Sequence, residues 1–373
     1  MRPALVYDYL NDYGGGERLL GIVARMFPEA PIYALMCDRK TMQDRFPGHE
    51  IITSPFDCAF ARRNHRALIP FLPLMAATVR VPDEYDTVIT LSASYGKGIR
   101  HGRHARHLLY CFTPLRYAWE PDFISSKFSH HTGIPFNRDG SFFVRAAAAP
   151  FAAYLRAWER RVAAKPDRIV TLSHFIAGKI GERYRREAPV VHPPIDSSRF
   201  FFDPAIPKGD YFLAAGRLMH YKRFDLVIDA FNILGLPLKI VGTGGEAARL
   251  KARIRSPHIQ MLGFVPDDDL RQLYAGARAF IFPQVEDFGL VGAEAIACGT
   301  PVIAFRGGGA AEIVTDGETG LFFDTQSPEC LAEAVRRFIA SEGSFDPARV
   351  ASLAQRFSPE SFAREFLAQL ALI

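Results

Sequence analysis

The stretch FIFPQVEDFGLVGAEAIACGTP, residues 280–301, indicates most directly how this chain folds. The apolar run Ala279–Phe282 predicts a buried strand, and Pro283 ends it. From Leu290 the apolar residues recur with helical spacing, and Gly299 stands where a C-terminal helix cap is expected. The stretch therefore predicts a strand, a tight turn and a helix.

Two glutamates flank this turn. Glu286 precedes it, and Glu294 lies eight positions later, in the first turns of the helix. Backbone N–H groups at a helix start attract phosphate, while nearby carboxylates suit the hydroxyls of a sugar or ribose. The junction, with Phe288, Gly289 and Leu290 at its centre, is therefore a candidate donor site for a nucleotide sugar. The alternative is an ordinary strand-turn-helix unit with surface acids.

Length and composition are typical of a globular enzyme with two domains. The chain has 373 residues, of which 49% are hydrophobic and 23% charged, and a net charge of +5. No apolar run reaches the roughly 18 residues of a membrane-spanning helix, and Met1-Arg2-Pro3 leads directly into a strand-like run without a signal peptide. We therefore expect a cytoplasmic protein. The cysteines lack CxxC spacing, which argues against a zinc site and a disulfide framework: 37, 58, 111, 298 and 330.

Strand and helix patterns alternate along the chain, which predicts an α/β fold with two parallel, doubly wound sheets. The strand candidates of the first half are Ala4–Tyr7, Pro31–Leu35, Glu50–Thr53, Asp86–Leu91, His107–Phe112 and Asp167–Leu172. Those of the second half are Tyr211–Ala215, Leu238–Val241, Ile259–Leu262, Ala279–Phe282 and Val302–Phe305. A linker at 197–208 separates domain 1–196 from domain 209–356. A helix within 357–373 is expected to pack back on the first domain.

Candidate ligand-binding residues of the first half follow its strands, because parallel sheets hold ligands at the carboxyl ends of strands. Gly15 and Gly16 open a helix after the first strand, where their backbone can approach a donor. Their spacing does not fit the GxGxxG fingerprint. Candidates for the acceptor or sugar side are Thr113, Arg116, Tyr117 and Ser173. Residues 123–145 are predicted to form a mobile loop, and 146–164 a helix.

The second half carries further candidates at its strand ends. Arg217 and Lys222 follow one strand as cations without an obligatory acid neighbour, and they suit a clamp on a diphosphate leaving group. Gly216, Gly242 and Gly244 allow the backbone to come close to a nucleotide. A single Arg or Lys is usually a solvated surface charge. The functional interpretation rests on several such strand ends occurring in one domain.

The segment Cys58–Val81 combines basic and apolar residues. Basic side chains beside an apolar face are typical of proteins that lie on a membrane interface. The alternative is a core helix with a solvated edge, interrupted by Pro70 and Pro73. The residues concerned are Arg62, Arg63, His65 and Arg66, with Leu68, Ile69, Phe71, Leu72, Leu74 and Met75.

Together these motifs resemble the retaining glycosyltransferases of family 4, which are two-domain GT-B enzymes. The paired glutamates, eight positions apart and followed by AIACGTPVIA, resemble the motif of that family. Further resemblance in the second half lies in GRLMHYKRFDLVIDAFN (216–232) and IVGTGGE (240–246). The first half resembles mannosyltransferases that use GDP-mannose in bacterial exopolysaccharide and O-antigen synthesis, in DYLNDYGGGERLL (8–20), TLSASYGKGI (90–99), LLYCFTPLRYAWE (108–120), SHFIAGKI (173–180) and VVHPPIDSSRF (190–200).

This resemblance implies a GT-B fold, two Rossmann-like domains with a cleft between them, and transfer of a hexose with retention. The donor is expected to be GDP-mannose and the acceptor a polyprenyl-diphosphate-linked or other lipid-linked saccharide. Catalysis is assigned to Arg217, Lys222 and Glu286, with Glu294 on the ribose. No metal or other cofactor is expected, and no nucleic acid partner. The enzyme would work peripherally on the inner face of the plasma membrane, in lipopolysaccharide or exopolysaccharide biosynthesis.

One position departs from the pattern of this group. Phe112 stands where a histidine is usual, and its side chain offers no hydrogen bond. This departure motivates one alternative, in which the chain is a catalytically silent subunit that binds a sugar nucleotide. A second alternative does not depend on Phe112: the donor could be a UDP- or TDP-sugar, because the residues that choose the base are not located in the sequence.

Overall fold

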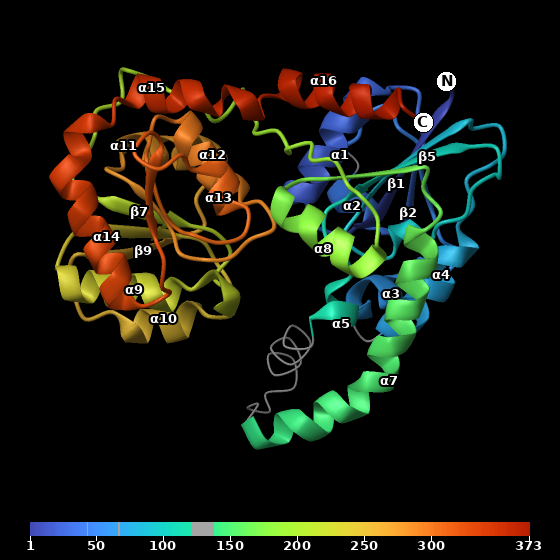
Figure 1. Ribbon diagram of the computed structural model, residues 1–373, viewed down its shortest axis with the longest axis horizontal. Coiled ribbons are helices and arrows are strands. Elements are labelled where there is room, and N and C mark those ends of the chain that lie inside the picture. Colours follow the sequence, from blue (N-terminus) through green and yellow to red (C-terminus); the bar gives the residue numbers. More distant parts are fainter. Residues whose placement is uncertain (43, 66–67, 121–137) are drawn as a thin grey trace. The chain divides into compact units, whose positions relative to one another are not determined.

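A computed structural model describes residues 1–42, 44–65, 68–120 and 138–373 (Figure 1). The chain divides into two compact units, Met1–His192 with Ala363–Ile373, and Pro193–Phe362. The limits drawn from the sequence stay predictions. Within the described part of the chain, no helix is both long and apolar enough to cross a membrane.

The first unit contains a six-stranded sheet in the order β3-β2-β1-β4-β5-β6, and all of its pairings are parallel. Its strands are β1 (Pro3–Leu10), β2 (Ile32–Cys37), β3 (Ile51–Thr53), β4 (Thr87–Ser92), β5 (Arg106–Cys111) and β6 (Arg168–Thr171). From β1 the chain moves outward in one direction to β3 and then returns to add β4 to β6 on the other side. This reversal is the mark of a doubly wound sheet, so the predicted α/β fold class is confirmed for this unit.

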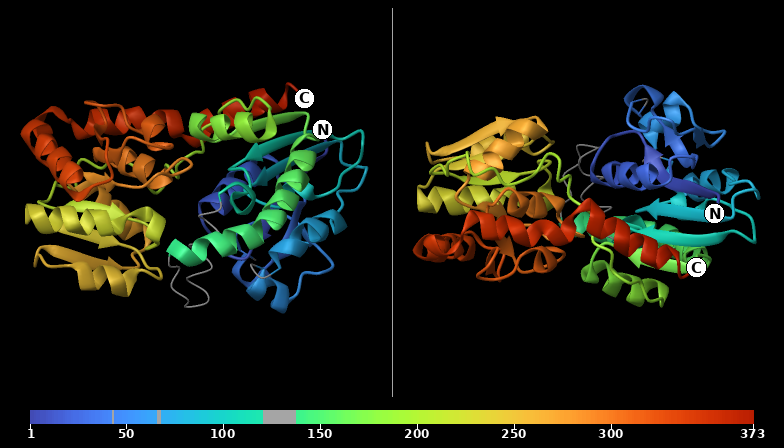
Figure 2. Two further views of the ribbon diagram at one scale, coloured as in Figure 1. Left: turned by 60° about the horizontal axis from the view of Figure 1, so that its bottom comes forward. Right: turned by 90° about the horizontal axis from the view of Figure 1, so that it is seen from above.

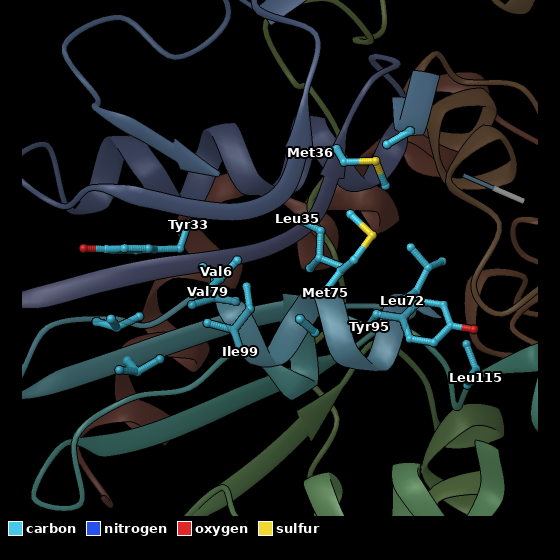
Figure 3. Close-up of a cluster of buried hydrophobic side chains, with 14 of the residues drawn as sticks. Val6, Tyr33, Leu35, Met36, Leu72, Met75, Val79, Tyr95, Ile99 and Leu115 are labelled. Carbon is cyan, nitrogen blue, oxygen red and sulfur yellow. The ribbon is translucent and has the colours of Figure 1, made fainter. Parts of the chain in front are cut away.

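The core of the first unit explains why these residues form strands. β1, β2 and β4 are buried along almost their whole length, because helices cover both faces of a parallel sheet. β1 and β2 are mainly apolar, whereas β4 also contains Thr87, Thr90 and Ser92. On one face Val6 and Leu35 belong to a cluster of buried side chains with Met75 and Ile99 (Figure 3). Val88 of β4 belongs to the same cluster. The carboxyl ends of the strands are thereby held in one rigid edge.

The helices of the first unit include α1 (Gly15–Met26), α2 (Arg39–Met42), α3 (Ala59–Asn64), α4 (Leu72–Thr78), α5 (Arg116–Trp119), α7 (Arg138–Ala163) and α8 (His174–Tyr184). The 3-10 turn η1 (Ile69–Phe71) lies between α3 and α4, and the 3-10 turn η2 (Gly96–Gly98) lies between β4 and β5. α16 (Pro359–Leu370) begins in the second unit and ends in the first, where Gln369 accepts a 2.7 Å hydrogen bond from Arg168.

Helix α7 corrects one prediction. It begins at Arg138, so the expectation of a loop is wrong for 138–145, while 123–137 lie outside the described residues. The run Ala146–Ala149 favours helix strongly. Gly140 and Ser141 each oppose it by only about 1 kcal/mol or less, so the helix extends through them.

The second unit repeats the architecture with the strand order β12-β11-β10-β7-β8-β9, again entirely parallel. Its strands are β7 (Phe212–Ala215), β8 (Leu238–Val241), β9 (Ile259–Gly263), β10 (Phe280–Phe282), β11 (Val302–Phe305) and β12 (Gly320–Phe323). Its helices include α9 (Phe224–Leu234), α10 (Ala247–Arg253), α11 (Asp267–Gly276), α12 (Leu290–Ala297), α13 (Ala310–Ile313), α14 (Pro328–Ser341) and α15 (Pro347–Ser352). Figure 2 shows helices on both faces of the sheet in each unit, as the doubly wound prediction requires.

Candidate functional site

The predicted residues of the second unit gather at one edge of its sheet. β7 lies between β10 and β8, and these residues lie on or directly after the loops that leave the three strands. Since parallel strands end on the same side, these loops emerge side by side. The loops hold Gly216, Arg217 and Lys222 after β7, Gly242 and Gly244 after β8, and Glu286, Phe288 and Gly289 after β10, while Leu290 and Glu294 follow in α12.

Two of the predicted glycines serve the contact between loops. A Cβ on Gly242 would lie 1.9 Å from the carbonyl oxygen of Gly216, and one on Gly244 would lie 2.4 Å from that of Leu218. Both glycines also have positive φ angles, 139° and 157°. The loops after β7 and β8 therefore meet backbone to backbone, which accounts for these glycines before any nucleotide is considered.

Lys222 and Glu286 form an ion pair at this edge. The Nζ of Lys222 bonds Oε1 of Glu286, and Gln284 Nε2 lies 3.4 Å from the same oxygen. The expectation of a cation without an acid partner is therefore wrong for Lys222, because the pairing joins residues 64 positions apart. A bound diphosphate would compete with Glu286 for this ammonium group.

Arg217 has a different environment from Lys222. It directly follows Gly216, is exposed to solvent and forms no ion pair with the described residues. This environment fits the prediction from the sequence that Arg217 is a cation without an acid neighbour. The turn is held by its backbone, because Met219 N donates to the carbonyl of Arg217 at 2.8 Å.

The turn between β10 and α12 rests on a glycine loop that the sequence argument did not assign to the site. The N–H of Gly309 donates to the carbonyl of Glu286 at 2.9 Å. A Cβ on Gly308 would lie 2.4 Å from that carbonyl oxygen, and one on Gly309 would lie 2.4 Å from the backbone of Phe288. The run of three glycines after β11 was the available signal, and it fits a close backbone approach.

Three predicted donor residues lie at the junction of this turn and α12. Gly289 has φ 105°, and a Cβ there would lie 2.5 Å from the ring of Phe282, so the chain requires glycine for its own packing. Phe288 is buried against the ring of Phe357, with centroids 5.4 Å apart. Leu290 starts α12, whose first N–H groups lack helical acceptors. The turn thus places the start of α12, with these N–H groups, after the carboxyl end of β10.

Glu294 is a buried carboxylate within α12. The hydroxyl of Tyr274, from α11, donates to its Oε2 at 3.4 Å. Burial, followed by the charge of Glu294, raises the pKa of Tyr274 well above its ordinary value, so the phenol stays a donor. Tyr274 has no local sequence signal beyond a helical pattern and was missed.

The glycine turn of the first unit is fastened by a glutamate. Glu17 accepts the N–H of Gly14 at 2.8 Å and the hydroxyl of Tyr7 at 2.9 Å. Burial raises the pKa of the Glu17 carboxyl. A Cβ on Gly16 would lie 2.3 Å from the Tyr7 hydroxyl, so this position requires glycine. The predicted Gly15 and Gly16 therefore start α1 in a fixed conformation.

Phe112, which stands where the resembled group usually has histidine, packs against aromatic rings. The ring of Phe112 lies edge-on to Tyr7, at 6.3 Å between centroids, and to Tyr110, at 5.5 Å. No hydrogen bond from this side chain reaches the glycine turn, since phenylalanine has no donor or acceptor.

The acceptor-side candidates lie at the carboxyl ends of β5 and β6. Ser173 is buried, and its hydroxyl caps α8 by accepting the N–H of Ile176 at 3.2 Å. Thr113 is also buried, and its Oγ1 has no hydrogen-bond partner among the described residues. Arg116 lies 3.9 Å from Glu120, and Tyr117 packs partly into the core. Arg116 and Tyr117 are thus the half-exposed pair of this group.

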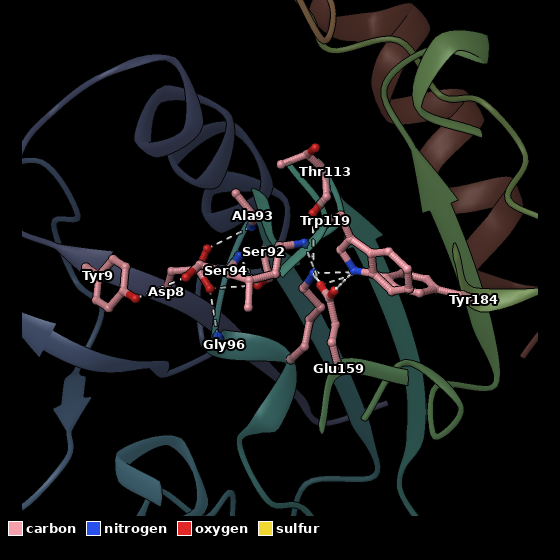
Figure 4. Close-up of polar contacts among 12 residues, drawn as sticks. Asp8, Tyr9, Ser92, Ala93, Ser94, Gly96, Thr113, Trp119, Glu159 and Tyr184 are labelled. Atoms are coloured by element: carbon pink, nitrogen blue, oxygen red, sulfur yellow. Dashed lines mark hydrogen bonds and ion pairs between the residues drawn. The ribbon is translucent and has the colours of Figure 1, made fainter. Parts of the chain in front are cut away.

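Two buried carboxylates support the strand ends of the first unit and were not predicted (Figure 4). Asp8 accepts hydrogen bonds from Ser92 Oγ, Ala93 N and Gly96 N at 2.6 to 2.7 Å. Burial raises its pKa, against the effect of these bonds. The second carboxylate, Glu159, lies between the turn after β5 and α8.

A cavity lies away from these residues. It has a volume of about 950 Å³ and opens at the amino ends of β4 and β5, where Arg80, Asp83, Arg100 and Lys165 are among its lining residues. No predicted site residue lines it. Among the described residues no cluster of three or more His, Cys, Asp or Glu side chains could hold a metal ion.

Comparison with known proteins adds family information for the second unit. Residues 196–358 match the family model described as glycosyl transferases group 1. An uncharacterized glycosyltransferase of Methanocaldococcus jannaschii is 29% identical over 182 residues, 47% of this chain and 50% of that protein. The GDP-mannose-dependent alpha-(1-6)-phosphatidylinositol dimannoside mannosyltransferase of Mycobacterium tuberculosis is 31% identical over 217 residues, 54% of this chain and 56% of that protein. The chain thus spans about half the length of the curated relatives it matches.

Solved structures extend the likeness to the whole fold. Anabaena HepE in complex with UDP has a TM-score of 0.72 over 100% of both chains, at 17% sequence identity. At this identity the likeness concerns the fold. It confirms the GT-B fold that the sequence predicted.

Proposed function

We propose that this protein is a retaining glycosyltransferase that moves a hexose from a nucleotide sugar to a lipid-linked saccharide. The observation that carries the proposal is the Lys222–Glu286 pair at the carboxyl edge of the second sheet, beside the start of α12. It lies within residues 196–358, which match the glycosyl transferases group 1 model. A cation, a carboxylate and helix N–H groups together suit a diphosphate joined to a sugar.

The proposed chemistry is a single transfer with retention of configuration. The bond between the sugar's anomeric carbon and the diphosphate oxygen breaks, and a bond from an acceptor hydroxyl forms on the same face. The acceptor proton passes to the leaving phosphate. Arg217 and Lys222 stabilise the charge that develops on that phosphate. Glu286 orients the sugar hydroxyls, and Glu294 binds those of the ribose.

The reaction is proposed to need no metal, because two cationic side chains can neutralise the diphosphate. Turnover should therefore persist in EDTA at wild-type rates. A loss of activity that added Mg²⁺ or Mn²⁺ restores would refute this part. Binding of the nucleotide alone, measured with and without EDTA, would separate a metal needed for binding from one needed for transfer.

GDP-mannose is the proposed donor. The Mycobacterium tuberculosis relative is named as GDP-mannose-dependent, whereas Anabaena HepE was solved with UDP. Thermal unfolding with GDP, UDP and TDP and their sugars distinguishes these donors, since a ligand raises Tm in proportion to ln(1 + [L]/Kd). If only UDP and UDP-sugars raise Tm, GDP-mannose is not the donor, but the proposed class of reaction still holds.

Phe112 supports one alternative, a silent subunit that binds a sugar nucleotide without transferring the sugar. Phe112 packs edge-on against the rings of Tyr7 and Tyr110, and its own side chain offers no hydrogen bond at this position. Binding of GDP-mannose with neither transfer nor hydrolysis would favour the alternative. The retained Lys222–Glu286 pair argues for an active enzyme.

The first unit has a surface that suits contact with an anionic membrane. Phe56, Phe60, Phe71 and Leu74, on or next to α3, η1 and α4, have 56–68% of their surface exposed. Arg63 is exposed on α3, while Arg66 lies outside the described residues. Exposed aromatic residues beside arginine fit a lipid interface better than water. We propose that this surface holds the enzyme at the inner face of the plasma membrane.

Vesicle binding tests the membrane proposal. The variant Phe60→Ser/Phe71→Ser should lose sedimentation with vesicles of phosphatidylglycerol and phosphatidylcholine. The control is Phe264→Ser in the second unit, because Phe264 is 77% exposed and lies outside the surface. Equal loss in both variants, or no vesicle binding by the wild type, would contradict the proposal.

A further inference from the structure

Glu159 joins four parts of the first unit through one buried carboxylate (Figure 4). It is fully buried on α7. Its oxygens accept hydrogen bonds from Lys97 Nζ at 2.5 Å, Tyr184 OH at 2.5 Å, Leu115 N at 2.7 Å and Trp119 Nε1 at 2.6 Å. The donors come from η2, α8, the turn after β5, and α5. Four donors satisfy nearly all of the acceptor capacity of a carboxylate.

The charge of Glu159 is balanced within the same cluster. Lys97 is buried beside it, and its Nζ also bonds the carbonyl of Thr113 at 3.3 Å and the hydroxyl of Tyr184 at 3.0 Å. Burial alone would lower the pKa of Lys97, but the charge and hydrogen bond of Glu159 outweigh burial and raise it. Lys97 therefore stays protonated and donates to Glu159, to Thr113 O and to the Tyr184 hydroxyl.

A second set of ion pairs holds the other end of the same turn. Glu120 lies 2.9 Å from Lys179 and 3.4 Å from Arg183, both on α8. Arg183 and Arg160 also lie over the ring of Trp119, 5.7 and 4.9 Å from its centroid. The segment from Leu115 to Glu120 is thus fixed at both ends, with Arg116 and Tyr117 between the fixed points.

We infer that Glu159 is a positioning residue: it fixes the turn from Leu115 to Trp119 and so sets where Arg116 and Tyr117 stand for the acceptor. The inference rests on the proposed function for its effect on transfer. Apolar packing alone would keep the turn against the core but would not fix the exact position of each residue in it. The hydrogen bonds from Leu115 N and Trp119 Nε1 to Glu159 do so, because one fixes a backbone atom and the other fixes the indole ring. Glu159 itself is buried beneath the turn and acts through it.

Two matched variants test the inference. Trp119→Phe removes one donor to Glu159 from the turn and keeps an aromatic ring. Tyr184→Phe removes one donor to the same carboxylate from α8, outside the turn. Amide hydrogen exchange across 113–120 should rise in Trp119→Phe and stay near wild type in Tyr184→Phe. Losing one bond to a charged group predicts an increase on the order of tenfold or more.

Kinetics supply a second readout that simple loss of stability would not change. With GDP-mannose and undecaprenyl-diphosphate-linked N-acetylglucosamine as probes, Trp119→Phe should raise KM for the acceptor severalfold and leave KM for the donor unchanged. Tyr184→Phe should leave both KM values unchanged, even if its Tm falls by the same amount.

Two results would overturn the inference. One is equal hydrogen exchange across 113–120 in both variants at matched Tm. The other is a Trp119→Phe enzyme with faster exchange but an unchanged acceptor KM. A wild type that transfers no sugar would instead refute the proposed function, while the exchange data would still decide whether Glu159 fixes the turn.

Discussion

Each unit contains a lysine–glutamate pair near the carboxyl ends of its strands, and the two pairs differ in solvent access. The side chains of Lys97 and Glu159 in the first unit have 0% exposure, and Glu159 accepts four hydrogen bonds. Those of Lys222 and Glu286 in the second unit are 10% and 19% exposed. The sealed pair holds backbone, whereas the more accessible pair is the one that we propose to exchange its partner for a ligand. The same two groups therefore suit a structural anchor in one place and a binding site in the other.

The largest expected effect comes from breaking the sealed pair. Lys97→Met would leave Glu159 buried and charged without its partner, which costs about 3–5 kcal/mol of unfolding free energy. Urea unfolding at pH 7 measures this loss. The double variant Lys97→Met/Glu159→Leu should recover part of the stability, since no charge then stays buried. If Lys97→Met lowers the free energy of unfolding no more than the same substitution of an exposed lysine does, the proposed distinction between the two pairs is wrong.

Breaking the accessible pair should affect activity more than stability. Lys222→Met removes a cation proposed to stabilise the leaving diphosphate, and we expect kcat to fall on the order of 10²–10³-fold. Its unfolding free energy should change less than that of Lys97→Met, because water still reaches Glu286. Steady-state kinetics and urea unfolding on the same preparation measure both effects.

A matched control for Lys222→Met is Lys251→Met, an exposed lysine on α10 of the same unit. It should keep the activity of the wild type. If Lys222→Met stays active but loses much stability, the Lys222–Glu286 pair is structural, like the Lys97–Glu159 pair. That result would remove the main support for the diphosphate site.

The same contrast shows what the sequence could predict. The strand, turn and helix within 280–301 depend on neighbouring residues, and the structure has them as β10 and α12. The alternation of such units predicted both sheets. The pairing of Lys222 with Glu286, by contrast, joins positions 64 apart, and no local period encodes it.

The polar clusters of the first unit were beyond sequence reasoning for a similar reason. Lys97 and Glu159 lie 62 positions apart, and each alone reads as a surface charge. Glu159 stands in a helical pattern with several other charged residues, so nothing marks it as buried. The glycines at 308 and 309 were visible as a run, but only the fold shows that they support the turn at Glu286.

The smallest expected effect concerns Glu120, whose exposure lies between that of ordinary surface groups and the sealed pair. Its side chain is 27% exposed. Burial alone would raise its pKa, but Lys179, Arg116 and Arg183 together hold it below the ordinary value of 4.5. A carboxyl whose pKa is lower in the folded state adds stability above its unfolded pKa and loses it as pH falls through the folded value.

Glu120→Gln should therefore be less stable than the wild type at pH 6–7, and the difference should close as pH falls below about 4.5, the unfolded value. Urea midpoints of both proteins between pH 3.5 and 7 measure the difference. Glu333→Gln is the control, since Glu333 is 63% exposed and pairs with Arg336 on the surface of α14. Its difference from wild type should be near zero at every pH. If the difference in urea midpoint between Glu120→Gln and wild type is constant with pH, packing and not charge holds this end of the turn. The bonds to Glu159 would then be the polar contacts that fix the segment.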